Sequence, residues 1–274
     1  MQRQKIVVKG APHGMTVKDF LRREGYSVTL IKRIKYGGIL LSGVPVTVRA
    51  TVKDGDEIEL VLKGGACSDI APMNIDIRVL YEDEYLVALD KPTNMPTHPS
   101  RGNSLPTLAN AVMGMYGEDF TFRAVNRLDR DTSGIVIIAK DQHTASLLSK
   151  DMQAGKFKKK YSCRVEGVPL QREGLIDAPI ERECEGSIKR VVREDGKRSI
   201  TEYKVIDYDG ETSLCEIILH TGRTHQIRVH MAYIGTPLLG DFLYGTPSEG
   251  KYFLRCTEIR LPHPVTKEEL VIKA

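Results

Sequence analysis

The segment of residues 126–134 holds the side chains most able to carry out chemistry. Within it, Asp129 stands between Arg127 and Arg130, on what we expect to be a loop before the apolar run of residues 135–139. Nearby cations favour the charged form of a carboxyl group, so we expect Asp129 to be ionised at neutral pH. An ionised carboxylate can act as a nucleophile or as a base. The segment is therefore a candidate active site.

A second basic segment, residues 221–230, lies far downstream and offers a cationic partner for that carboxylate. It contains Arg223 and Arg228, together with His225 and His230. The two histidines lack the H-E-x-x-H spacing of a zinc site. We expect them to pack against a helix or to support the backbone.

The composition predicts a globular protein. The chain has 274 residues, of which 41% are apolar, enough for one large domain or two compact ones. No run approaches the roughly 20 apolar residues that span a bilayer, and the polar opening of residues 1–5 lacks the apolar core of an export signal. We therefore expect a soluble, cytoplasmic protein without a membrane segment.

The cysteines predict neither disulfides nor a structural metal. They are Cys67, Cys163, Cys184, Cys215 and Cys256. An odd, scattered set without a C-x-x-C pair is typical of buried or idle thiols. We expect no bound metal.

Positive charge is concentrated near the N-terminus. Residues 1–65 hold 12 of the 40 lysines and arginines but 6 of the 36 acidic residues, whereas residues 66–274 hold 28 and 30. The first part thus carries 12 − 6 = +6 and the second 28 − 30 = −2. Segregated positive charge on a small unit is typical of binding to a phosphate backbone.

The N-terminal part predicts two helices followed by strands. Thr16 and Asp19 have the spacing of a helix cap, and the apolar stripe after them ends at Gly25. A second helix fits residues 27–36, with an apolar face and a basic face. The apolar face holds Leu30, Ile31 and Ile34, the basic face holds Lys32, Arg33 and Lys35, and strands are expected over residues 39–41, 44–48 and 57–62.

This order of elements, over about residues 13–62, resembles the S-four-like RNA-binding module of ribosomal and RNA-modifying proteins. The resemblance implies that Lys32, Arg33 and Lys35 contact RNA, and the alternative is that they form only a solvated helix face. We expect the module to occupy residues 1–65, a linker residues 66–75, and a catalytic domain residues 76–274.

Strands dominate the sequence from residue 75 onward. The runs 77–81 and 85–90, separated by a turn, predict a hairpin. Further strands are expected over residues 161–166, 200–208 and 212–220, and helices over residues 105–116 and 142–154. We therefore expect an α+β catalytic domain around a mixed, mostly antiparallel sheet, preceded by a small ααβ RNA-binding module.

Four ordered segments resemble the motifs of the RluA-type (RluA/RluD-like) RNA pseudouridine synthases. They are residues 90–92 with 98–99, residues 127–134, residues 160–167, and residues 221–230 followed by 235–241 and 244–245. The resemblance covers about residues 76–264. A single R-L-D-R motif would be weak support, whereas four motifs in order are specific.

The resemblance implies isomerisation of a uridine within RNA, with Asp129 as the catalytic carboxylate. The bond from the ring nitrogen to ribose breaks, the uracil turns, and a carbon–carbon bond to ribose forms, so the chemistry demands no cofactor and no metal. Arg223 matches the family arginine that pairs with the catalytic aspartate. Tyr161 matches the tyrosine that lies against the target base.

Other positions are expected to contact the RNA substrate. Arg127 matches a residue that contacts phosphate or fills the gap left by the extruded nucleotide, and Leu254 is expected to line the base pocket. RNA contacts are also expected from Arg130, Lys160 and Arg228. The basic residues 189–193 and 197–198 form either an RNA-contacting hairpin or a merely exposed one.

Three positions depart from the family pattern. Asn126 and Arg255 replace histidines, and Asn94 replaces a glycine. Because asparagine tolerates left-handed backbone angles, Asn94 can keep the turn of the glycine. Asn126 keeps hydrogen bonding but cannot titrate. These changes bear on substrate choice or turnover speed rather than on the type of reaction.

Two other functions fit parts of the sequence. One is an RNA-binding or ribosome assembly factor that has lost turnover, for which Asn126 is the only hint. The other is a hydrolase that uses Asp129, although Asp131 is a poor second carboxylate for glycoside hydrolysis. As substrate we favour ribosomal over transfer RNA, and we expect a monomer.

Overall fold

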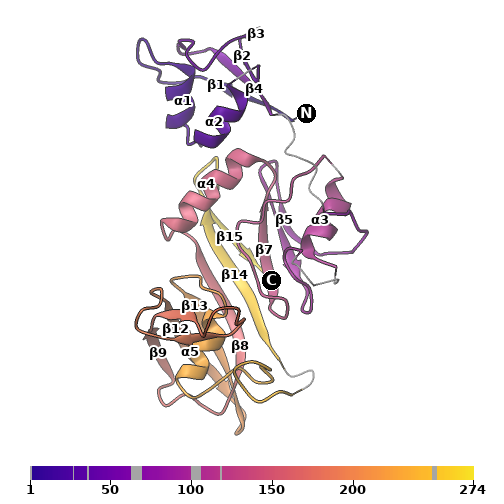
Figure 1. The fold of residues 1–274 in the computed structure, drawn as a ribbon, viewed down its shortest axis with the longest axis vertical. Coiled ribbons are helices and arrows are strands. Elements are labelled where there is room, and N and C mark those ends of the chain that lie inside the picture. Colours follow the sequence, from indigo (N-terminus) through magenta and orange to yellow (C-terminus); the bar gives the residue numbers. More distant parts are fainter. Residues whose placement is uncertain are drawn as a thin grey trace.

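A computed structural model describes residues 2–26, 28–35, 37–62, 70–99, 106–117, 119–248 and 252–274. It shows a small N-terminal module beside a larger α+β body that contains a nine-stranded sheet (Figure 1). The predicted α+β class and mostly antiparallel sheet are confirmed. Within the described residues, no helix is long and apolar enough to cross a membrane.

The N-terminal module packs two helices on a four-stranded sheet of order β1-β4-β2-β3. Its elements are β1 (Gln2–Val7), α1 (Val17–Arg23), α2 (Val28–Ile34), β2 (Ile39–Leu41), β3 (Val44–Pro45) and β4 (Glu57–Leu62). The Thr16 side chain accepts the amide of Asp19 and so caps α1 as predicted. On α2, Leu30, Ile31 and Ile34 are buried while Lys32 and Lys35 are exposed. The side chain of Arg33 lies outside the described part.

Strand β1 was not predicted, and β3 is shorter than the expected run of residues 44–48. β1 pairs antiparallel with β4, and Arg3–Glu59 and Lys5–Glu57 ion pairs join the two strands. Its polar sequence gives little apolar alternation, and its stabilising partner lies more than fifty residues away. The local pattern therefore gave no strand signal.

The large sheet has the order β5-β6-β7-β14-β8-β13-β12-β9, and β15 pairs with β14. Among the described strands, only β7 and β14 pair in parallel. The strands are β5 (Val79–Glu82), β6 (Leu86–Lys91), β7 (Ser133–Ala139), β8 (Lys158–Glu166), β9 (Glu173–Asp177), β12 (Ile200–Tyr208), β13 (Thr212–Leu219), β14 (Leu254–Pro262) and β15 (Glu269–Lys273). The predicted β5–β6 hairpin is confirmed.

Three helices and a small hairpin complete this part of the chain. They are α3 (Leu108–Tyr116), α4 (Gln142–Gln153), α5 (Gln226–Tyr233), and the antiparallel pair β10 (Ile180–Arg182) and β11 (Arg190–Val192). The helices α3 and α4 confirm the two predicted ones, although residues 100–105 and 118 lie outside the described part. The thiols of Cys163, Cys215 and Cys256 are buried and free, that of Cys184 is exposed and free, and Cys67 is not described.

One row of residues across the sheet brings the candidate site together. Cys256 of β14 is in register with Gly134 of β7 on one side and with Tyr161 of β8 on the other. Gly134 directly follows the loop that carries Asp129. Strand β14, from near the C-terminus, therefore places this loop close to β8 (Figure 1).

Part of the expected linker packs on the larger body. Asn110 of α3 donates its side-chain amide to the carbonyl of Ala71 over 2.7 Å. The Asn110 carbonyl in turn accepts the amide of Met73 over 3.0 Å. Residues 71–73 are thus fixed against α3, while residues 66–69 of the expected linker lie outside the described residues.

Gly134 offers a test of the sheet geometry. Its φ is +106°, and an added Cβ would overlap the carbonyl oxygen of Cys256 and lie 2.7 Å from its amide nitrogen. We expect Gly134→Ala to lower the free energy of unfolding by about 3 kcal/mol or more, because backbone strain adds to the overlap. Gly210 has a similar φ of +100° with nothing within 4 Å of an added Cβ. Chemical denaturation of Gly210→Ala should show a smaller loss, of about 1 to 2 kcal/mol, and equal losses would contradict the overlap.

Candidate active site

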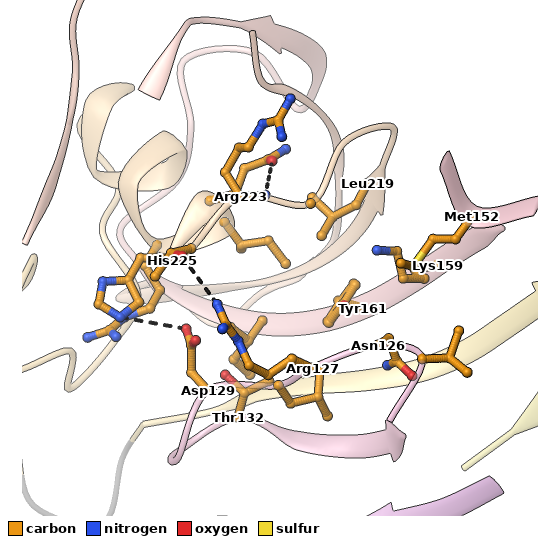
Figure 2. Close-up of a pocket in the computed structure, with 18 residues that line it drawn as sticks. Asn126, Arg127, Asp129, Thr132, Met152, Lys159, Tyr161, Leu219, Arg223 and His225 are labelled. Atoms are coloured by element: carbon orange, nitrogen blue, oxygen red, sulfur yellow. Dashed lines mark hydrogen bonds and ion pairs between the residues drawn. The ribbon is translucent and has the colours of Figure 1, made fainter. Parts of the chain in front are cut away.

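A cavity of about 280 Å³ opens between the end of β8, the residue 126–132 loop and the N-terminus of α5 (Figure 2). It brings together six of the residues predicted from the sequence. They are Arg127, Asp129, Tyr161, Arg223, Arg228 and Leu254. Arg130 and Lys160 are not among the lining residues. Asp129 keeps 27% of its side chain exposed, so its carboxylate is accessible from the cavity.

The loop that carries Asp129 is held by buried hydrogen bonds on both sides. Before it, the Thr97 hydroxyl donates to the carbonyl of Leu128 over 2.8 Å. After it, the ammonium of Lys91 donates to the carbonyl of Arg130 over 3.1 Å. The Thr132 amide closes a turn onto the Asp129 carbonyl over 3.2 Å. These bonds set the direction of the Asp129 side chain.

Lys91 is a fully buried cation beneath this loop. Besides the carbonyl of Arg130, its ammonium binds the carbonyls of Pro92 and Met95 over 2.9 and 2.7 Å. Burial lowers the pKa of Lys91 to about 8, although the nearby carboxylates of Asp131 and Asp129 oppose this change. Lys91 therefore joins the turn of residues 92–95 to the loop that carries Asp129.

Two of the three departures from the family pattern have a local explanation. Asn94 adopts φ +56°, so it keeps a left-handed turn as predicted. Asn126 is buried, donates to the carbonyl of Ile135 and accepts the amide of Ile137. Both ends of its amide therefore brace β7, a role that requires hydrogen bonding and no titration. Arg255 forms a 2.7 Å ion pair with Asp90.

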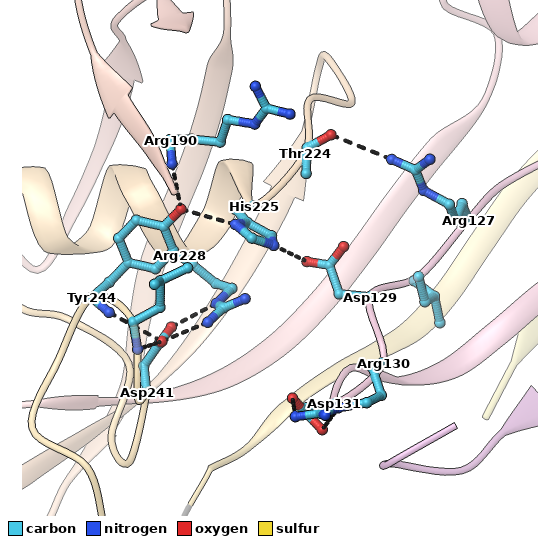
Figure 3. Close-up of polar contacts among 12 residues, drawn as sticks. Arg127, Asp129, Arg130, Asp131, Arg190, Thr224, His225, Arg228, Asp241 and Tyr244 are labelled. Atoms are coloured by element: carbon cyan, nitrogen blue, oxygen red, sulfur yellow. Dashed lines mark hydrogen bonds and ion pairs between the residues drawn. The ribbon is translucent and has the colours of Figure 1, made fainter. Parts of the chain in front are cut away.

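The arginines that flank Asp129 in sequence do not hold its carboxylate. Arg130 turns to Asp131 and forms two 3.0 Å hydrogen bonds with it. Arg127 reaches across the cavity to the hydroxyl of Thr224, at 3.3 Å (Figure 3). Adjacent residues on a turn point in different directions, so sequence proximity to Asp129 did not mean side-chain contact.

The expected pair between Arg223 and Asp129 is not formed in this structure. The Arg223 guanidinium points away from Asp129 and donates to the carbonyl of Arg198 over 3.2 Å (Figure 2). Gln226 holds the loop in this conformation. Its side-chain oxygen accepts the Arg223 amide and the Thr221 hydroxyl, over 3.0 and 2.8 Å.

Arg228 lines the cavity, and its positive charge interacts with Asp129. It is only 4% exposed and forms a two-point contact with Asp241, at 2.7 and 2.6 Å (Figure 3). Burial lowers the pKa of Arg228, but hydrogen bonds to Asp241 and the charges of Asp241 and Asp129 raise it to a value above the ordinary one. The rings of Tyr244 and Phe242 also flank this guanidinium.

Strand β8 presents Lys159 and Tyr161 to the cavity, and Lys160 to the other face. Tyr161 is 5% exposed, and burial raises its pKa well above the ordinary value. Lys160 forms a 3.0 Å ion pair with Glu216. Lys160 therefore does not line the cavity, because alternate residues of a strand point to opposite faces, and the RNA contact predicted for it would have to be made outside the cavity.

Comparison with known proteins agrees with this arrangement. The profile of a family described as RNA pseudouridylate synthase matches residues 85–233. The uncharacterized RNA pseudouridine synthase YjbO of Bacillus subtilis is 37% identical over 93% of this chain and 93% of its own length. Ribosomal large subunit pseudouridine synthase D of Xanthomonas campestris is 36% identical over 77% of this chain and 65% of its own.

Solved structures share the fold. Human RNA pseudouridylate synthase domain containing 1 has a TM-score of 0.63 at 22% identity, over 73% of this chain and 83% of its own. This chain belongs to the RNA pseudouridylate synthase family. The resemblance found in the sequence motifs is thus confirmed, and the protein is an RNA pseudouridine synthase.

Among the cavity residues of this synthase that were not predicted as part of the site, Lys159 and His225 bear on the chemistry. Lys159 lies at the side of the cavity away from Asp129, near Met152 and Leu219 (Figure 2). The period of two along β8 could have revealed it, since Tyr161 and Lys159 must share a face. His225 lies next to Asp129, with 3.9 Å between Nε2 and Oδ2. Nothing local predicts that contact, because the two residues are distant in sequence.

Of the two histidines expected to pack against a helix or to support the backbone, His230 does so in this synthase, whereas His225 lines the cavity beside Asp129. His230 is fully buried, and its ring nitrogens lie 2.8 Å from the Thr201 hydroxyl and 2.9 Å from the Ala178 carbonyl. It thereby anchors α5 to the sheet. Within the described residues, no group of three or more histidine, cysteine or acidic side chains has the arrangement of a metal site.

Proposed function

We propose that this synthase isomerises uridines in ribosomal RNA with Asp129 as the catalytic carboxylate. The observation that carries the proposal is the partly exposed Asp129 carboxylate in a cavity that also holds Tyr161 and the charge of Arg228. The cavity volume of about 280 Å³ lies just below the range of roughly 300 to 1,000 Å³ for small-molecule sites. Such a space suits a single pyrimidine.

The reaction conserves the atoms of the nucleotide. The bond from uracil N1 to ribose C1′ breaks, and a bond from uracil C5 to C1′ forms. The proton lost from C5 is balanced by a proton gained at N1. Asp129 serves as the nucleophile or as the base in this exchange, and the cavity walls keep the detached uracil near C1′.

The uridine must leave its base stack to reach Asp129. In this proposal Tyr161 lies against the extruded base, an interaction worth about 1–3 kcal/mol. The exposed Arg127 at the cavity edge contacts a neighbouring phosphate or takes the place of the base in the stack. Leu254 and Leu219 supply apolar surface for the uracil ring.

The choice of ribosomal RNA is supported by relatives and by charge. One relative is named for the large ribosomal subunit. The basic N-terminal module, with Lys32 and Lys35 exposed on α2, suits a structured phosphate backbone. In the proposal this S-four-like module binds the RNA and the cavity selects the uridine. Arg130 and residues 189–198 are further candidates for phosphate contacts.

Mapping pseudouridines in total RNA from cells with and without the gene tests this function. Carbodiimide labelling stops reverse transcription at pseudouridine, and we expect one or more stops in ribosomal RNA to disappear on deletion. Re-expression of the wild-type protein should restore them, and the Asp129→Asn variant should not. Unchanged stops in ribosomal RNA would overturn the proposed substrate, and lost stops in transfer RNA would replace it.

Lys159 and Lys160 form a matched pair for a test of the cavity. Breaking the glycosidic bond leaves negative charge on the uracil, which an ammonium within the cavity stabilises. We expect Lys159→Met to lower the release of tritium from RNA labelled at uracil C5 by about 10- to 100-fold. Lys160→Met, on the other face of β8, should remain within about threefold of wild type, because it loses only a surface ion pair. Equal effects of the two changes would contradict the placement of the cation.

A further inference from the structure

His225 stands in a strained backbone conformation beside Asp129. It precedes α5 with φ 58° and ψ 17°, in the left-handed region that residues other than glycine rarely adopt. Such strain costs of order 1–3 kcal/mol and persists only where the surroundings enforce it. The ring is 14% exposed, so the conformation directs a mostly buried imidazole into the cavity.

Both nitrogens of this ring face polar groups (Figure 3). Nδ1 lies 2.9 Å from the hydroxyl of Tyr244, and Nε2 lies 3.9 Å from Oδ2 of Asp129. The Tyr244 ring meets the imidazole edge-on, at 5.7 Å between centroids. The ring is therefore fixed on the Tyr244 side and free to approach the carboxylate on the other.

The partners of Tyr244 determine where the imidazole carries its proton. The Tyr244 oxygen accepts the backbone amide of Arg190 over 2.8 Å, so its own proton is available to His225 Nδ1. Burial raises the pKa of Tyr244 to about 12, which keeps that proton in place at neutral pH. A neutral imidazole that accepts at Nδ1 must carry its hydrogen at Nε2, and this hydrogen faces Asp129.

Burial favours the neutral form of His225. Burial lowers its pKa below the ordinary 6.5, with the positive charges of Arg228 and Arg190 acting in the same direction. The carboxylates of Asp129 and Asp241 oppose this effect without reversing it. At neutral pH the ring can thus donate a hydrogen bond to Asp129 without forming an ion pair that would weaken the nucleophile.

We propose that His225 is a positioning residue for the reaction: its Nε2–H holds one oxygen of Asp129, and Tyr244 and the Arg190 amide fix the ring that does so. This inference rests on the proposed catalytic role of Asp129. The gap of 3.9 Å closes to a hydrogen bond when RNA fills the cavity, since catalytic hydrogen bonds are often long in the free enzyme. With one oxygen held, the other is directed at the sugar or base. A misplacement of about 1 Å can cost on the order of 100-fold in rate.

Substitutions that tolerate the left-handed conformation test this proposal. His225→Gly and His225→Asn both accept φ near +58°, so the backbone can stay in place. We expect kcat to fall by about 10- to 100-fold in both variants, with KM and Tm close to wild type. Added imidazole should restore part of the turnover of His225→Gly, because the free ring can occupy the vacated space. Tyr244→Phe should lower kcat less, by about threefold to tenfold, since the His225 ring would lose only the hydroxyl that fixes its tautomer.

The pH profile gives a second readout. Protonation of His225 would pair it with Asp129 and weaken the nucleophile, so wild-type kcat should fall on the acid side, below pH 6.5. That acid limb should be absent from His225→Asn. His220, an exposed histidine bound to Glu202, provides the control, and His220→Asn should leave kcat and the limb unchanged.

The outcomes separate this proposal from the function on which it depends. Turnover of His225→Asn within twofold of wild type, or a His225→Gly loss that imidazole does not reverse, would overturn the positioning role. If Asp129→Asn is inactive in the same experiment, the proposed function survives that result. An active Asp129→Asn would instead remove the basis of both.

Discussion

Asp129→Asn is expected to abolish pseudouridine formation while leaving the fold and RNA binding intact. An amide can neither attack the sugar nor accept a proton, so turnover should fall on the order of 10⁴-fold or more. The side chain is partly exposed and its loop is held by backbone bonds, so the free energy of unfolding should change by less than about 0.5 kcal/mol. Tritium release from C5-labelled RNA measures the first effect and chemical denaturation the second.

Asp131 provides the matched control for this experiment. Its carboxylate lies two residues away and is engaged by Arg130 at the surface. Asp131→Asn should therefore retain turnover within about threefold, because a surface ion pair contributes only about 0–1 kcal/mol. If both variants lost activity equally, the damage would come from the loop and not from the nucleophile.

Arg228→Met is expected to destabilise the protein strongly and to inactivate it. The change leaves the fully buried Asp241 carboxylate without its guanidinium, and breaking a buried pair in this way costs about 3–5 kcal/mol. It also removes the positive charge that acts on Asp129. Urea denaturation followed by circular dichroism should show the loss of stability, and turnover should be measured at a temperature where the variant is folded.

Two further variants decide what this result means. The double change Arg228→Met and Asp241→Leu should regain part of the stability, because no unpaired charge remains buried. Arg223→Met should alter the free energy of unfolding by less than about 0.5 kcal/mol, since Arg223 is exposed and its guanidinium donates to a backbone carbonyl. A loss of under about 1 kcal/mol in Arg228→Met would contradict the importance of the buried pair.

The position of Arg223 differs between the active site predicted from the sequence and the one in the structure. The sequence motif predicted that the Arg223 guanidinium contacts Asp129. In the structure this guanidinium donates to the carbonyl of Arg198 instead, and the positive charge of Arg228 interacts with Asp129. Both arginines belong to one short segment, and the choice between them depends on where α5 begins. That boundary follows from the hydrogen bonds of the Gln226 side chain to Ile200 and Thr201, which lie on β12.

Features with local physical causes were predictable from the sequence. The Thr16 cap, the β5–β6 hairpin and the loop before β7 each depend on residues a few positions apart. Polar turn residues and capping hydroxyls act on their own backbone, so their pattern carries the information. The four motifs likewise indicated the family, because their order and residue types are specific.

Features that depend on partners far away in the sequence were not predictable from it. β1 is stabilised by β4, and β14 lies between β7 and β8 although both precede it by many residues. The place of a strand in a sheet depends on which other strands offer an unpaired edge, and a local sequence pattern contains no information about those edges.

The amino-acid sequence by itself determined the family, the α+β class and the identity of Asp129 as the candidate carboxylate. Only the tertiary structure decided which side chains act on that carboxylate: His225 lies beside it and the charge of Arg228 interacts with it, while Arg130 and Lys160 pair elsewhere. The physical reason is that side-chain direction is set by packing and by partners from remote strands, whereas residue type alone sets only what chemistry is possible.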